Sequence, residues 1–178
     1  MNTPIAPVAD LRAAGSARLM GQFDDLAEAI DGILGATDVH RLDDQTLLAA
    51  TRAVESLGRR VDALRTHCAS EIAERSPKGL GSERLSARMG CRTPAELIAR
   101  VTGSSEATAS RRVSLGMAVA PRDSLTGGAL PPRFPTVAAA MARGELGEDS
   151  ARVIVSVLGA VEHRADPCDW SAAESQLV

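Results

Sequence analysis

The chain contains one stretch that decides its fold, DDQTLLAATRAVESLGRRVDALRTHCASEIAER at residues 43–75. Apolar side chains recur in it at alternating steps of three and four, which is the heptad spacing of a helix that packs against another helix. Asp43 and Asp44 stand where an N-cap and a first-turn acid belong. The pattern predicts an amphipathic helix of about 30 residues, or ~45 Å at 1.5 Å per residue.

A helix of this length is too long to be buried along its whole length in one small domain. We therefore expect its apolar seam to pack against a second helix, in the same chain or in a second copy that forms a homodimer through residues 44–75. The candidate self-association residues are Leu47, Val54, Leu57, Val61 and Leu64. Gly58 interrupts the helix at a cost of about 1 kcal/mol, which the seam can offset.

A unit of short helix, glycine turn and longer helix follows. Residues 93–96, Thr-Pro-Ala-Glu, have the form of a capping box with proline at the first helical position. Gly103 is the natural left-handed residue that ends this helix. Ser104 or Ser105 then caps a second helix that runs to about Ala120.

A second unit has the same outline, with a short helix from Pro135 to about Gly144 and a longer one from Glu148 to about Val161. The acids at its start complement the helix dipole but would repel phosphate, so we interpret this unit as scaffold. No segment has the alternating pattern of a strand.

The sequence therefore predicts an all-α protein, a helical bundle with one long helix and two such units. We expect three regions: a leader and short helix over residues 1–41, the long helix over 42–75, and a helical domain over 76–178. Within the first region, residues 1–20 are expected to be a frayed Pro/Ala-rich leader, followed by a helix from about Gln22 to Leu34. The Ser-Pro-Lys-Gly-Leu-Gly run at 76–81 is the candidate boundary.

Composition indicates a cytoplasmic protein. The three cysteines are far apart and form no Cys-x-x-Cys pair, which fits a reducing compartment better than a disulfide framework. The start of the chain does not resemble a signal peptide, and no apolar run approaches the ~20 residues that span a membrane. Hydrophobic residues make up 44% of the chain, enough for an aliphatic core.

Charge is unevenly distributed. Residues 76–122 carry eight basic side chains against three acids, whereas residues 1–40 and 123–178 are both acidic. Arginine outnumbers lysine by far, which fits either phosphate binding or a GC-rich genome. A basic middle between acidic ends indicates where an anionic partner would bind.

The pair of helices around Gly103 has the outline of a helix-turn-helix. Hydroxyl groups at the start of its second helix, with arginines nearby, are suited to contact phosphates or base edges of double-stranded DNA. The candidate DNA-binding residues are Arg92, Arg100, Ser104, Ser105, Thr108, Arg111 and Arg112. The alternative is an ordinary helical hairpin with a solvated polar face.

No catalytic constellation emerges from the sequence. No nucleophile elbow, Walker loop, dinucleotide fingerprint or His-Glu-x-x-His helix is present. His67 and Glu71 could supply two metal ligands, but no matching pair completes a site, so no metal or cofactor is expected. No small-molecule substrate is evident.

Several segments together resemble a known family. They are LSARMG at 85–90, TPAEL at 93–97, VTGSS at 101–105, ASRRVSLG at 109–116, PTVAAAMARGELG at 135–147 and ARVI at 151–154. From about Leu42 to Val178 the chain resembles the actinobacterial "domain of unknown function 222" proteins, which include a mycobacterial repeat family found in many copies per genome.

In that family the helical domain usually precedes a C-terminal HNH nuclease domain, whose histidines and asparagine hold a divalent metal and activate water. No His-Asn-His or Cys-x-x-Cys pattern follows the Gly-Glu-Leu box here, and the sequence stops inside a helix that the family would continue. The resemblance therefore implies a helical fold and an association with nuclease or mobile-DNA proteins, without nuclease residues in this chain.

Three functional hypotheses remain. The chain is a DNA-binding or DNA-positioning module, a protein-interaction or self-association module through the long helix, or the inactive fragment of a longer HNH nuclease. In none of them does this chain act as an enzyme by itself.

Overall fold

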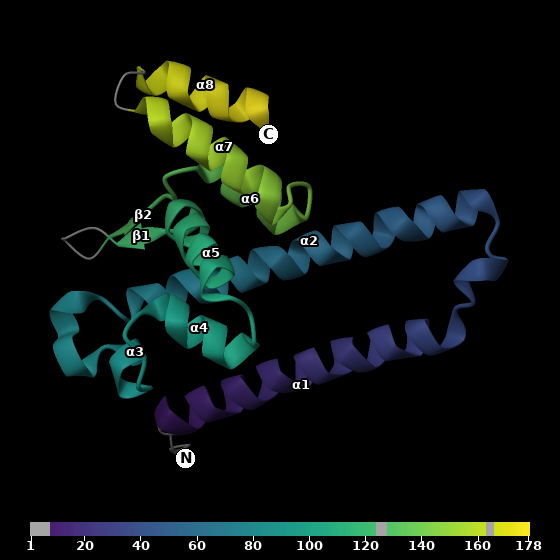
Figure 1. Cartoon of the computed structure of the whole chain (residues 1–178), viewed down its shortest axis with the longest axis horizontal. Coiled ribbons are helices and arrows are strands. Elements are labelled where there is room, and N and C mark those ends of the chain that lie inside the picture. The colour runs from purple at the N-terminus through teal and green to yellow at the C-terminus, as the bar shows by residue number, and fades with distance from the viewer. Residues whose placement is uncertain (1–7, 124–127, 163–165) are drawn as a thin grey trace, which may run out of the picture. The chain divides into compact units, whose positions relative to one another are not determined.

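The computed structural model describes residues 8–123, 128–162 and 166–178 (Figure 1). It confirms the all-α fold class. Eight α-helices are found among these residues, with two short 3₁₀ helices at Val39–Arg41 and Lys78–Glu83. The helices are α1 (Val8–Ala36), α2 (Asp44–Glu74), α3 (Leu85–Arg88), α4 (Pro94–Thr102), α5 (Glu106–Val119), α6 (Pro135–Arg143), α7 (Glu148–Val161) and α8 (Pro167–Leu177).

Between α5 and α6, two short strands pair in antiparallel fashion, β1 (Arg122–Asp123) and β2 (Ala129–Leu130). The strand pair is too short to change the fold class.

The first helix is longer than expected. α1 begins at Val8 and ends at Ala36, whereas the sequence predicted a frayed leader over residues 1–20 and a helix from about Gln22. Alanine and arginine dominate residues 9–18, and both have high helix propensity, so this stretch is helical without a strong apolar periodicity.

The chain divides into two compact units, residues 1–49 and 50–178. The sequence analysis placed boundaries near residues 41 and 76 instead. The break at 76–81 is a 3₁₀ helix with a left-handed Gly81, φ +52°, so the backbone does turn there. However, most of α2 belongs to the same unit as the helices that follow it.

α2 and α5 approach each other closely at Gly116 in the second unit. A Cβ atom added at Gly116 of α5 would lie 2.7 Å from the backbone oxygen of Thr66 and 3.0 Å from the Cβ of Ser70. Only a residue without a side chain fits between the two backbones. Thr66, Ala69 and Ser70 are accordingly the buried residues of α2.

α6 lies on the same side of α2. The Arg59 Nε donates a hydrogen bond to the Gly144 carbonyl at 2.6 Å, and a Cβ at Gly144 would lie 2.8 Å from the Arg60 Cγ. Gly144 adopts the left-handed conformation that ends α6, with φ +73°. The first half of α2 within this unit is therefore joined to the end of α6.

α5 separates two hydrophobic clusters. On one side, Ala109 of α5 packs with Ala69 of α2 and Ile98 of α4. On the other, Leu115 and Ala118 of α5 pack with residues of α6 and α7. This larger cluster contains Phe134, Val137, Met141, Ala151, Ile154 and Leu158, with Trp170 of α8 at its edge. Figure 1 shows α6, α7 and α8 beside one another.

α8 contributes a buried acid to the second unit. The Glu174 side chain is 1% exposed, and its Oε1 accepts a hydrogen bond from the Val137 backbone N–H at 2.9 Å. Phe134, the residue before α6, offers no side-chain cap. Glu174 therefore acts as a cap from another helix, and its negative charge lies at the positive end of the α6 dipole.

The close approach of α2 and α5 yields a stability prediction. We expect Gly116→Ala to destabilise the protein by about 1–3 kcal/mol, because the new methyl group overlaps the Thr66 carbonyl. Gly58→Ala is the matched control: nothing lies within 4 Å of its added Cβ, and alanine in a helix interior should stabilise by up to ~1 kcal/mol. Urea unfolding followed by circular dichroism measures both changes. Equal stability of the two variants would contradict the packing described here.

Candidate nucleic-acid interface

Two arginines are held by backbone carbonyls at the connection between α3 and α4. The Arg84 Nη2 donates to the Arg92 carbonyl at 3.2 Å, and the Arg100 Nη2 donates to the Met89 carbonyl. Both acceptors are neutral backbone oxygens. The hydrogen bonds thus hold the guanidinium groups in place without cancelling their positive charges.

Two further arginines belong to the same elements. Arg88, on the last turn of α3, is exposed, and no hydrogen bond or ion pair joins its guanidinium to another described residue. Arg92 is 89% exposed and pairs with Glu96 at 3.5 Å, the only carboxylate contact within this group. We call Arg84, Arg88, Arg92 and Arg100 the arginine cluster.

Glu96 holds the N-terminal end of α4. The Thr93 Oγ1 accepts from the Glu96 backbone N–H at 3.0 Å, as the capping box predicted. The Glu96 carboxylate reaches back to the Arg92 N–H at 2.9 Å, one residue before the expected position. That N–H, with the charges of Arg92 and Arg100, lowers the Glu96 pKa. Its stabilising effect is present above the ordinary carboxyl pKa and is lost as pH falls through the lowered value.

α4 and α5 are joined by a short turn at Gly103, which is left-handed at φ +70° as predicted. The hydroxyl candidates at the turn have local roles. The Ser104 and Thr102 hydroxyls are 2.9 Å apart. The Ser105 Oγ caps α5 by accepting from the Thr108 N–H at 3.1 Å, and it also donates to the Thr108 Oγ1 at 2.9 Å. These hydroxyl groups stabilise the turn and the start of α5, so they have a structural role apart from any contact with DNA.

Arg111 lies apart from the arginine cluster. It is exposed and donates to the Thr108 Oγ1 at 3.1 Å. It lines a polar groove of about 550 Å³ between α2, α5 and α7, whose charged side chains are five acids and four arginines. The acids are Glu55, Asp62, Glu145, Glu148 and Asp149. Their combined negative charge makes this groove a poor place for phosphate.

The structure removes Arg112 from the predicted set of DNA-binding residues. Its Nε and Nη2 both donate to the Glu148 Oε2 at 3.2 Å, and each side chain of the pair is only 14% exposed. The pair joins α5 to α7 inside the fold. Because Glu148 comes 36 residues later in the chain, sequence spacing could not reveal this partner. We therefore remove Arg112 from the candidate DNA contacts.

The self-association candidates on α2 differ in how far their side chains are exposed. Val54 is 65% exposed, Leu64 43% and Leu47 38%, while Leu57 and Val61 are half-buried. Ile72, the last residue of the predicted seam, instead packs at the edge of the smaller hydrophobic cluster.

The seam is only partly exposed. α2 makes close contacts with α5 and α6 through small polar residues outside the seam, Ser56, Thr66 and Ser70. Of the seam itself, Val54 is exposed, whereas Leu64 lines a groove between α2, α5 and α6.

Among residues 8–123, 128–162 and 166–178, no group of three or more His, Cys, Asp or Glu side chains is arranged to hold a metal ion. No helix in this part of the chain combines the length and apolar character that a membrane crossing requires.

The described residues form an all-α fold. The family model "Domain of unknown function (DUF222)" matches residues 48–178, and the chain belongs to this family. The match begins within α2 and covers all the following helices.

Two relatives are uncharacterised proteins of Mycobacterium tuberculosis, from strains CDC 1551 / Oshkosh and ATCC 25618 / H37Rv. Each is 29% identical over 158 residues, which is 87% of this chain and 32% of the relative. The chain thus spans about a third of the length of the relatives it matches. No solved structure matches it.

The Arg112–Glu148 pair can be tested by a double-mutant cycle. We expect Arg112→Ala or Glu148→Ala alone to cost about 2–3 kcal/mol, because each leaves a largely buried charge without its partner. The double variant Arg112→Ala/Glu148→Ala should lose less stability than the sum of the two single losses. Urea denaturation measures the free energies of unfolding. A loss below ~0.5 kcal/mol for both single variants would place the pair among weak surface ion pairs.

Proposed function

We propose that this chain is a non-catalytic helical module that binds duplex DNA through its arginine cluster, as part of a longer protein. One observation carries the proposal. Arg84 and Arg100 are anchored by backbone carbonyls and Arg88 has no partner among the described residues, so none of the three is paired with a described carboxylate; Arg88 and Arg100 are exposed and Arg84 is half-buried. Phosphate oxygens are the acceptors such groups bind best.

The surrounding charge supports this choice. Between Lys78 and Arg111 the sequence carries six basic side chains and three acids. Elsewhere in the second unit the typical arginine is paired, as in Arg65–Asp62, Arg143–Glu145 and Arg152–Asp149. An electrostatic interface of this kind gives affinity for the DNA backbone and carries little sequence information. Arg111 and the turn hydroxyls remain candidates for secondary contacts.

The salt dependence of binding tests the proposal. Wild-type protein should bind a labelled duplex with an affinity that falls steeply between about 50 and 200 mM salt. Arg84→Gln/Arg88→Gln/Arg100→Gln should weaken binding and reduce the log–log salt slope by roughly 0.9 per lost phosphate contact. Fluorescence anisotropy of the duplex measures both quantities.

The control is a second triple variant with the same change in charge, Arg65→Gln/Arg143→Gln/Arg152→Gln. Each of these arginines already pairs with a carboxylate, so the salt slope should stay within error of wild type. Absence of salt-sensitive binding at micromolar protein, or equal losses in both triple variants, would refute the proposal.

Self-association through α2 is the second candidate function. It is favoured by the seam, which is apolar and exposed at Val54. A second α2 helix could cover it by heptad packing.

Val54→Asp tests this candidate, because it introduces a charge at the most exposed seam position. It should lower the mass measured by light scattering from dimer to monomer. Leu48→Asp is the control, an equally polar change at an exposed residue of α2 outside the seam. A monomeric wild type, or a Val54→Asp dimer, would exclude a dimer built on the seam.

A further inference from the structure

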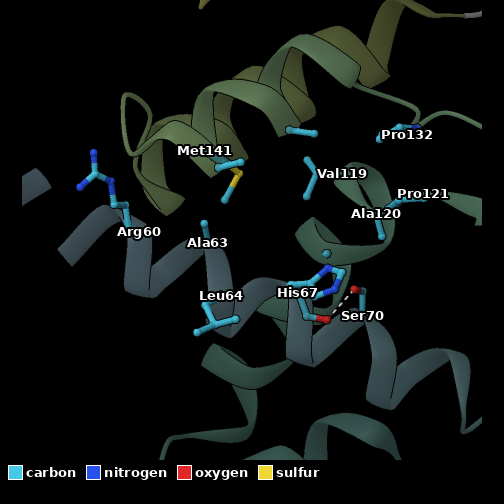
Figure 2. Close-up of a pocket in the computed structure, with 13 residues that line it drawn as sticks. Arg60, Ala63, Leu64, His67, Ser70, Val119, Ala120, Pro121, Pro132 and Met141 are labelled. Carbon is cyan, nitrogen blue, oxygen red and sulfur yellow. Dashed lines mark hydrogen bonds between the residues drawn. The ribbon is translucent and has the colours of Figure 1, made fainter. Parts of the chain in front are cut away.

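A groove of about 430 Å³ lies between α2, α5 and α6 (Figure 2). Arg60 of α2 stands at one end, and Pro121 and Pro132 stand at the other. Between them, Ala63 and Met141 face the groove from α2 and α6. This volume falls within the ~300–1,000 Å³ typical of small-ligand sites.

The lining combines apolar side chains with positive charge. Ala63, Val119, Ala138 and Met141 give the groove an apolar wall. Of the thirteen lining residues none is acidic, whereas two, Arg60 and His67, are basic. The polar groove around Arg111, by contrast, is lined by five acids.

Arg60 is held at the end of the groove. Its Cγ lies against Gly144, where an added Cβ would come within 2.8 Å. Its guanidinium has no hydrogen bond or ion pair with another described residue, although Arg59 next to it is bonded to the Gly144 carbonyl. The aliphatic part of Arg60 is thus fixed by packing while the N–H donors of its guanidinium are unoccupied, which suits it to bind an anionic group.

His67 lies further along the same wall. It follows Arg60 by seven residues, two helical turns or about 10 Å, so both side chains project from one face of α2. Its carbonyl accepts from the Ser70 Oγ at 2.8 Å (Figure 2), while no partner for its imidazole is found among the described residues. It offers a second polar contact beside the apolar wall.

We propose that this groove binds a small amphiphilic carboxylate, with the carboxylate on Arg60 and the apolar chain along Ala63, Met141 and Val119. Charge selects the head group, since the lining holds two basic residues and no acid. The sequence had indicated no small-molecule ligand, because no motif marks residues drawn from three helices. This site does not depend on the proposed DNA binding.

Decanoate is the probe, used below its micellar concentration on the full chain with ¹³C-methyl-labelled methionine. The Met141 methyl signal should shift saturably with decanoate. Decylamine and decan-1-ol, which share the chain but lack the negative charge, should bind at least about tenfold more weakly, as expected when one charged contact is lost.

Two variants locate the site. Arg60→Gln should weaken decanoate binding about tenfold or more, whereas Arg65→Gln, an exposed arginine of α2 outside the groove, should not. Ala138→Leu should block the apolar part, and its circular dichroism spectrum reports whether it remains folded. Because Arg60 is exposed, its replacement tests the site even if Ala138→Leu fails to fold.

Three results would overturn the proposal. The first is no saturable shift of Met141 in the wild type. The second is equal affinity for decanoate, decylamine and decan-1-ol, which would indicate apolar adsorption without a charged site. The third is unchanged affinity in Arg60→Gln.

Discussion

The second unit depends on the close approach of α5 to α2 at Gly116. With 2.7 Å between an added Cβ and the Thr66 oxygen, the two backbones leave no space for a side chain. Such contact is possible only along a face of small residues, so α2 turns Ser56, Ala63 and Ser70 inward. Of the heptad seam, Val54 stays exposed, whereas Leu64 lines the groove beside α5 and α6 and Ile72 packs on the smaller cluster. Packing density at one crossing thus decides which residues of a long amphipathic helix come into close contact.

The same crossing places α5 between the two hydrophobic clusters. Its early residues pack with α2 and α4, and its later residues pack with α6 and α7. The Arg112–Glu148 pair adds a polar link between α5 and α7, and Glu174 adds one between α8 and α6. Each link satisfies a charge or an N–H group that burial would otherwise leave costly.

Arginines in this protein differ in their acceptors. Those that pair with carboxylates, such as Arg112 and Arg143, contribute to structure or to local surface pairs. Those held by carbonyls, such as Arg84 and Arg100, keep their charge available. The kind of acceptor, more than the number of arginines, decides whether a surface is suited to bind phosphate or has its positive charges neutralised by neighbouring carboxylates. It also separates the α3–α4 connection from the polar groove beside Arg111.

The sequence by itself determined the local structure. Heptad spacing, the Thr93 cap, and the glycines at 103 and 144 act over a few residues, and the structure has the helix starts and stops that they predict. The tertiary structure alone decided which side chains meet. Glu148 reaches Arg112 across 36 residues, Arg84 and Arg100 donate to the backbone carbonyls of Arg92 and Met89, and α2 makes close contacts with α5 and α6 through small residues outside its seam. These contacts follow from how helices cross, and helix crossings depend on side-chain volumes distant in sequence, which periodicity does not encode.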